Sequence, residues 1–510
     1  MSKGIVLLLI FLYLISLMTG GFVLFFGNIA ETMAKYPLII VILLMFSLFL
    51  LVLTALAIIY DCSVTVLIAL LFVIIAIMPF MNDYLKVYSG KAIKEHISYL
   101  STPLPVKMTR IIPLETAGAY AESLLQIPTH FINFNTSYLY YANDTVIFCM
   151  IVEPEGFWNS LRWNAKGIIL VNGSNYPPKV TFIDQNLYWS FNRKRFKLLY
   201  FDSLKRQLKI RALPYRPLFE NAIEVCIDRH VYILVPIIRW ERGLSYSYPV
   251  LHSYAVIDED GEIELVKPNR LSENRVTHFV FYVYKAPIVP EIVARQWVEL
   301  LRWSVGYLNV ILYHKTFVIR DIGLNAQPYL VYDDNGHLYW LFVVEPSGKS
   351  YAVKYIIYVD AESIEPRILL YEPTEQWIGA SKLFSYIQKA HPTYDWDKFR
   401  LAEPIPIIVN DTLYWKITII TSDARGVVSI DLVNAKTGVV YSLPVTKTLS
   451  KNMFNTFVNT LSVETTKEHK EKPSLDRIQS LKQRIKELID ILQELLEELE
   501  EMEKELKNKS

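Results

Sequence analysis

The sequence is poor in the residues that build metal centres and disulfide frameworks. Its 510 residues include 3 cysteines and 9 histidines. No CxxC pair occurs and no two histidines lie two or four positions apart, which excludes a four-ligand zinc site and the HExxH helix of zinc proteases. Cys149 and Cys226 could still form one bridge, although two small apolar side chains buried in strands are the simpler interpretation.

The sequence also lacks an excess of charge of either sign. Lysine and arginine number 52 against 51 aspartates and glutamates, which gives a net charge of +1. A nucleic-acid-binding surface needs a basic stripe, so we expect no nucleic-acid partner. The nucleophile elbow G-x-S-x-G is missing as well. We therefore predict that the protein is not an enzyme and has no catalytic residues, metal or cofactor.

Charge is almost absent from residues 1–81. Three uncharged runs occur there, at 4–26, 37–59 and 63–80. The first two are long enough to cross about 30 Å of hydrocarbon as helices. We expect three transmembrane helices, a multi-pass location in the cell membrane and membrane lipid as a partner. A cleaved signal peptide is the alternative for the first run.

Two sequence patterns disagree about the side of the membrane on which the large domain lies. Lysines flank the spans on the side of that domain, which favours a cytoplasmic location by the positive-inside rule. Four N-x-S/T sequons in the large domain favour the outside, because glycosylation happens only there. We expect an extracytoplasmic domain, with a cytoplasmic-facing one as the alternative. The candidate glycosylation sites are Asn135, Asn143, Asn172 and Asn410.

The stretch FVVEPSGKS, residues 342–350, ends in Gly-Lys-Ser, the last three letters of a phosphate-binding P-loop. A P-loop needs a glycine five positions before that ending. Val343 stands there, inside an apolar run typical of a strand. The stretch is therefore not a nucleotide site.

The same stretch instead marks an internal repeat, because Glu-Pro-x-Gly occurs both at 153–156 and at 345–348. Two longer alignments surround it: 138–156 with 329–348, and 166–184 with 354–372. A repeat of this period indicates a duplicated structural unit. Each copy reads as a helix followed by an antiparallel sheet. We predict a first α+β half at 113–283 and a second at 284–446, after a juxtamembrane linker at 82–112.

Two further segments, 230–266 and 412–443, carry the same hairpin in weaker form. A helix is expected before the last copy, at 374–390. Residues 374–443 resemble a PepSY-type module, a small cystatin-like unit, through the strand LYWKITII and the hairpin IDLVNAKTGVVYSL. The resemblance implies a helix-plus-sheet fold and an extracytoplasmic interaction or inhibitory role without catalytic residues.

The last 37 residues, 474–510, carry an unbroken 3-4 spacing of apolar residues that predicts a coiled coil. A polar linker at 447–473 precedes it. Extra apolar residues widen the stripe beyond a two-stranded seam, so we expect a homo-oligomer or a helical protein partner. The seam residues are Ile478, Leu481, Ile485, Leu488, Leu492, Leu495, Leu499, Met502 and Leu506.

Together these patterns predict a membrane-anchored α+β protein with N-terminal transmembrane helices, a duplicated helix-plus-antiparallel-sheet ectodomain and a C-terminal coiled coil. The function that we expect is that of a non-enzymatic cell-envelope scaffold or interaction protein. The alternative is an accessory or regulatory subunit of a membrane transporter or membrane peptidase.

Overall fold

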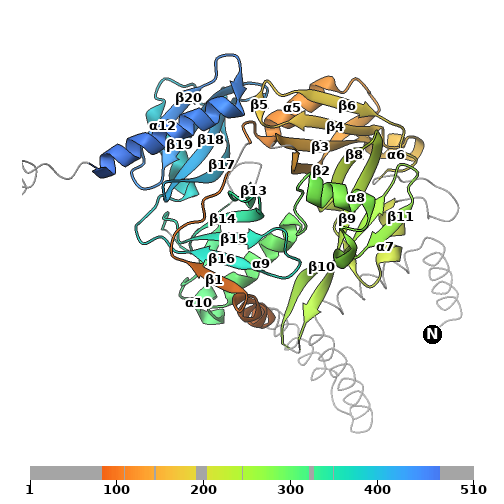
Figure 1. The fold of residues 1–510 in the computed structure, drawn as a ribbon, viewed down its shortest axis with the longest axis horizontal. Coiled ribbons are helices and arrows are strands. Elements are labelled where there is room, and N and C mark those ends of the chain that lie inside the picture. The colour runs from red at the N-terminus through yellow and green to blue at the C-terminus, as the bar shows by residue number, and fades with distance from the viewer. Residues whose placement is uncertain are drawn as a thin grey trace, which may run out of the picture. The chain divides into compact units, whose positions relative to one another are not determined.

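Four separate sheets, antiparallel except for one parallel pair in the third, make up most of the structure, and a helix precedes the main strands of each (Figure 1). The computed structural model describes residues 83–107, 110–142, 145–190, 204–243, 245–320, 327–348 and 350–470. We call each helix with its sheet a module and number the four modules in chain order.

The first module contains a four-stranded sheet of order β2-β3-β4-β6. The segments 138–156 and 166–184, which the sequence alignments paired with later residues, lie on these strands. A short helix, α6 (Gly156–Arg162), follows β3. The main elements are α5 (Leu114–Leu124), β2 (His130–Ala142), β3 (Thr145–Pro154), β4 (Gly167–Asn172) and β6 (Val180–Asp184).

The second module contains a sheet of order β11-β10-β9-β7, with β8 also paired to β9. Strand β9 is buried along most of its length, so its sequence HVYILVPIIRWER reads as a continuous apolar run rather than an alternation. The elements are α7 (Leu204–Ala212), β7 (Arg216–Pro217), β8 (Ile223–Ile227), β9 (His230–Arg242), β10 (Ser247–Ile257) and β11 (Ile263–Val266). The short helix α8 (Arg275–His278) follows this sheet.

The third module contains a six-stranded sheet of order β1-β16-β15-β14-β12, with β13 also paired to β14. Residues 83–94 form a helix, and the strand after it, β1 (Ile97–Leu100), pairs in parallel with β16. The other elements are α9 (Glu291–Trp303), α10 (Tyr307–Ile311), β12 (Phe317–Ile319), β13 (Tyr329–Tyr332), β14 (Leu338–Pro346), β15 (Tyr355–Asp360) and β16 (Ile368–Tyr371).

The fourth module contains a meander of order β17-β18-β19-β20. The 3-10 turn η4 (Ala380–Lys382) leads into its helix. Strands β5 (Asn175–Tyr176) and β21 (Leu449–Ser450) form a separate two-stranded pair. The module consists of α11 (Leu383–Ala390), β17 (Phe399–Val409), β18 (Thr412–Thr421), β19 (Val427–Asn434) and β20 (Val440–Pro444).

Helix α9 has an apolar face that it can bury only by packing against a sheet. Its apolar residues fall at intervals that place them on one face of a helix, and that face is fully buried. Each large apolar side chain buried in this way contributes roughly 1.5–3 kcal/mol to folding. Trp297 is the centre of the contact, and its indole N–H donates to the Pro249 carbonyl of β10 at 2.7 Å. The α9 core therefore includes side chains from the second module as well as the third.

The predicted membrane-anchored fold and multi-pass location in the cell membrane are wrong for this structure, which is a mixed α/β protein. None of the helices in the described ranges combines the length and the apolar character that a bilayer crossing requires. The longest of them, α12 (Lys451–Lys470), has 20 residues but carries charged side chains such as Glu464 and Lys467. The three predicted spans and the coiled coil at 474–510 lie outside the described residues.

Candidate functional site

The predicted glycosylation sites lie in different surroundings. Asn410 is exposed at the turn between β17 and β18. Asn172 ends β4 and is half-buried, and its side-chain oxygen accepts a hydrogen bond from the Ser174 amide at 2.9 Å. Asn135 belongs to β2, while Asn143 lies outside the described residues. The four sites stay predictions, as do the nine seam residues of the coiled coil.

The Glu-Pro-x-Gly motif at 345–348 connects the third module to the fourth. The Glu345 side chain is only 1% exposed. Its two carboxylate oxygens accept hydrogen bonds from the Ser381 amide at 3.0 Å and the Ser381 hydroxyl at 2.8 Å. Ser381 lies in η4, directly before α11, so the glutamate satisfies donors at the start of the next module's helix.

Two other Glu-Pro pairs make contacts of the same kind. Glu153, in the first copy of the motif, is fully buried and accepts from the Ser190 hydroxyl at 2.8 Å. Glu403, in β17, accepts from the amide of Leu114, the first residue of α5, at 2.8 Å. These buried acids therefore hold elements of the fold together, and Glu403 joins the fourth module to the helix of the first.

Glu403 also belongs to a buried cluster of charges. Its Oε2 lies 2.6 Å from Nη2 of Arg110, and both side chains are at most 5% exposed. Lys416 of β18 is completely buried, and its ammonium lies 3.4 Å from the Ile111 carbonyl. Burial, together with repulsion from Arg110, lowers the pKa of Lys416 to about 7, against a smaller opposing effect of Glu403. This lysine is therefore partly neutral near physiological pH.

Four histidines of the described ranges form hydrogen bonds or ion pairs, His130, His230, His337 and His391, and none of them stands in a catalytic arrangement. His391 is the most suggestive, because it contacts both Asp431 and Ser442. Both contacts use Nε2, at 2.6 Å to Asp431 and 3.3 Å to Ser442. A Ser-His-Asp relay needs the two partners on opposite ring nitrogens. Within the same ranges, no group of three His, Cys, Asp or Glu residues is placed to hold a metal ion.

Neither described cysteine takes part in a bridge. Cys149 is buried, and Cys226 is half-buried with a pKa that burial raises. The interpretation of these residues as small side chains within strands fits their positions in β3 and β8.

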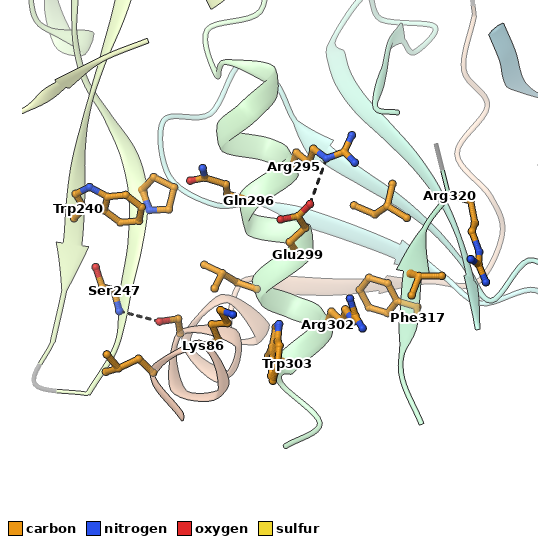
Figure 2. Close-up of a pocket in the computed structure, with 16 residues that line it drawn as sticks. Lys86, Trp240, Ser247, Arg295, Gln296, Glu299, Arg302, Trp303, Phe317 and Arg320 are labelled. Carbon is orange, nitrogen blue, oxygen red and sulfur yellow. Dashed lines mark hydrogen bonds and ion pairs between the residues drawn. The ribbon is translucent and has the colours of Figure 1, made fainter. Parts of the chain in front are cut away.

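A pocket of about 690 Å³ lies over α9 (Figure 2). Its walls come from five elements in separate stretches of the chain: the helix 83–94, the ends of β9 and β10, and α9 with β12. The volume is typical of a site for a small molecule. The Ser247 amide donates to the Ser89 hydroxyl at 2.9 Å and so ties β10 to the helix 83–94 at the rim.

The lining of this pocket is cationic. Lys86, Arg295, Arg302 and Arg320 line it together with one acid, Glu299. Because the whole chain has a net charge of only +1, this is a local concentration of positive charge, which attracts anions.

Three of the four cations are already engaged. Arg295 contacts Glu299 at 3.3 Å and donates to the Gln327 carbonyl at 2.6 Å. Arg320 donates to the Gly348 carbonyl at 3.2 Å and lies 3.6 Å from Glu345. Lys86 pairs with Asp83 at 2.8 Å. The Nε atoms of Arg302 and Arg320 are both buried without a hydrogen-bond partner in the described part of the chain, but only Arg320 also contacts Glu345 and the Gly348 carbonyl.

Two neutral polar groups of the lining share this property. The side-chain oxygens of Gln296 and Ser247 are buried and have no hydrogen-bond partner among the described residues. A buried polar group without a partner costs roughly 1–3 kcal/mol. The pocket thus presents the Arg302 guanidinium and the side-chain oxygens of Gln296 and Ser247 as groups whose hydrogen-bonding capacity a bound molecule can satisfy.

Aromatic rings complete the walls. Trp303 stands beside Arg302, and the Lys86 ammonium lies 5.0 Å from the centre of its ring (Figure 2). Phe317 lies on the β12 side, and Trp240 faces Gln296 on the opposite side of α9 (Figure 2). Flat apolar faces next to a cation suit an organic anion better than a hydrated inorganic one.

Sequence reasoning did not find this pocket. It predicted a helix in each copy of the repeat and left the polar face of α9 uninterpreted. Arg295 and Arg302 are seven positions apart, about two helical turns, and this spacing was the available signal that they share a face. The other walls could not be assigned, because nothing in the sequence brings residues 86, 240 and 302 together.

No protein-family model, curated protein or solved structure matches this chain.

Proposed function

We propose that this protein is a non-enzymatic interaction protein: a scaffold of four helix-and-sheet modules that associates with further chains through its C-terminal heptads. The observation that carries the proposal is the use of the buried acids. Glu345 and Glu403 satisfy donors at the start of helices in other modules, and Glu153 accepts from Ser190, a residue outside the β2-β3-β4-β6 sheet. Acids placed in this way assemble a scaffold and do not face a substrate.

The arrangement of His391 supports the same proposal. Its contacts with Asp431 and Ser442 bridge α11's C-terminal end to β19 and β20 and do not activate the hydroxyl. The PepSY-type resemblance of residues 374–443 is part of the proposal as well. It is supported by the order of the fourth module, a helix followed by a four-stranded meander, and it implies an interaction role.

Self-association is tested with a double variant of the seam, Leu488→Asp with Leu492→Asp. Both residues occupy seam positions, and a carboxylate buried between helices costs several kcal/mol. The wild-type protein should sediment as an oligomer and the variant at the mass of one chain. Sedimentation equilibrium of the full chain measures this directly.

A matched control introduces the same charges outside the seam, as Gln483→Asp with Gln493→Asp. These positions lie away from the 3-4 stripe, so the oligomer mass should not change. An unchanged mass in the Leu488/Leu492 variant, or a monomeric wild-type protein, would contradict self-association. The second result would assign the stripe to a different helical chain.

A further inference from the structure

We infer that the pocket over α9 is a binding site for an organic anion, a molecule that carries a phosphate or carboxylate on a flat apolar body. This inference goes beyond the proposed function and does not depend on self-association. It rests on the described pocket alone, whose residues all belong to one compact unit of the chain.

Arg302 is the group that we assign to the anion. Its guanidinium is planar and permanently charged, and its forked donors match the oxygens of a phosphate or a carboxylate. Arg295 and Arg320 are held by Glu299, Glu345 and backbone carbonyls, whereas the Nε of Arg302 has no such partner in the described ranges. The engaged arginines add positive potential, and Arg302 can supply the direct contact.

The apolar body of the ligand is assigned to the rings beside Arg302. Trp303 and Phe317 lie next to its side chain in Figure 2. Burial of one aromatic face of the ligand removes apolar area from water, which contributes about 25 cal/mol per Å² to the free energy of binding. An inorganic anion cannot gain this contribution, so the walls select for an anion with an attached ring or other flat group.

The far side of the pocket adds a polar requirement. Gln296 and Ser247 present two buried oxygens without partners in the described part of the chain, near Trp240. An acceptor such as the Gln296 oxygen repels a second anionic group and favours a donor. The preferred ligand therefore has its charge at the Arg302 end and a hydroxyl or amino group at the other.

The test is calorimetric titration of the full-length protein with naphthyl phosphate, compared with inorganic phosphate and with naphthol. Naphthyl phosphate combines the charge and the ring, so it should bind about tenfold or more tightly than either fragment. Raising the ionic strength should weaken naphthyl phosphate binding and leave naphthol binding unchanged, because salt screens only the charged contact.

Two variants separate the two contributions. Arg302→Met keeps the volume and removes the charge, and should weaken naphthyl phosphate about tenfold or more. Trp303→Leu should weaken naphthyl phosphate but not inorganic phosphate. Arg270→Met is the matched control, because Arg270 is an exposed arginine of the second module paired with Glu273, and it should bind like the wild-type protein.

The inference fails if naphthyl phosphate does not bind, if naphthol binds as tightly, or if Arg302→Met leaves the affinity unchanged. Near-ultraviolet circular dichroism verifies that each variant is folded. The salt dependence tests the charged contact in the wild-type protein even if Arg302→Met does not fold. Binding by the Leu488/Leu492 variant should equal that of the wild-type chain, which separates this result from the oligomer test.

Discussion

At the scale of single residues, Lys416 is the most unusual group in the described structure. A fully buried ammonium is costly, and the pKa of about 7 shows how strongly its surroundings favour the neutral amine. In the unfolded chain the pKa of Lys416 returns to its ordinary value near 10.5. Between these two values the unfolded state binds more protons than the folded state, so the free energy of unfolding rises with pH across that window.

Replacing Lys416 by methionine should remove this pH dependence. Between pH 7 and pH 9 the free energy of unfolding of the wild-type protein should rise, relative to the variant, by up to about 1.4 kcal/mol per pH unit. Urea unfolding at several pH values measures the difference. The exposed Lys389 of α11 provides the control, since Lys389→Met removes a surface lysine and leaves Lys416 in place, so the rise with pH should persist. Parallel pH profiles for wild type and Lys416→Met would show that the lysine is not neutralised by burial.

The Glu-Pro pairs could be read directly from the sequence, but the contacts that their glutamates make could not. The two copies of Glu-Pro-x-Gly were recognised as a repeat, and Val343 correctly excluded a P-loop because it lies within β14. What the glutamates contact depends on residues such as Ser381 and Leu114, which lie tens to hundreds of positions away. Local periodicity carries no information about such distant partners.

At the scale of elements, the close contact between the helix 83–94 and α9 shapes the pocket. Gly90 is the residue that permits it. A Cβ atom there would lie 2.2 Å from the Leu300 carbonyl oxygen and 2.8 Å from the Ser304 amide nitrogen, both backbone atoms of α9 and its end. Backbone atoms cannot rotate away as a flexible side chain would, so any larger residue must push the two helices apart.

We therefore expect Gly90→Ala to cost about 1–3 kcal/mol of stability, as overpacked contacts do, even though alanine is the better helix former. The same change should weaken naphthyl phosphate binding, because the helix 83–94 brings Lys86 and Ser89 to the wall. Thermal unfolding and calorimetry measure the two effects. Lys91→Ala, on the exposed side of the same helix, should alter neither. A Gly90→Ala protein with wild-type stability would show that the helices are not in this contact.

Most strands could be anticipated, whereas the walls of the pocket could not. The paired segments 138–156 and 329–348 lie on β2–β3 and β13–β14, because strands alternate with Gly, Asn and Asp turns in a pattern visible in the sequence. Helix α9 was visible through its apolar stripe for the same reason. The pocket depends on how elements from three stretches of the chain meet, and that is a tertiary property.

At the scale of the whole molecule, the prediction of a membrane-anchored protein was based on hydropathy alone, and the described helices do not support it. The described modules instead share their cores. One apolar cluster contains Val146 of the first module, Ile238 and Val250 of the second, and Trp297 and Phe342 of the third. Cores shared in this way predict that these modules unfold together.

The ion pair between Arg110 and Glu403 extends this expectation to the fourth module. Glu403→Gln leaves Arg110 buried without its partner charge and should cost about 3–5 kcal/mol. Urea unfolding followed by tryptophan fluorescence and by far-ultraviolet circular dichroism should shift to lower urea as one transition in both signals.

The control for this variant is Glu375→Gln, which breaks an exposed pair with Lys436 and should cost less than about 1 kcal/mol. Two separate transitions in the Glu403→Gln protein would mean that the fourth module folds independently of the rest.

The hydrogen bond from the Leu114 amide to Glu403 connects the last module of the chain to the helix of the first. Covalent order and spatial neighbourhood therefore differ: the peptide chain links the modules one after another, while this buried contact links the fourth back to the first. The helix 83–94 and β1 make a second crossing of this kind, because they precede the first module in the chain but pack in the third.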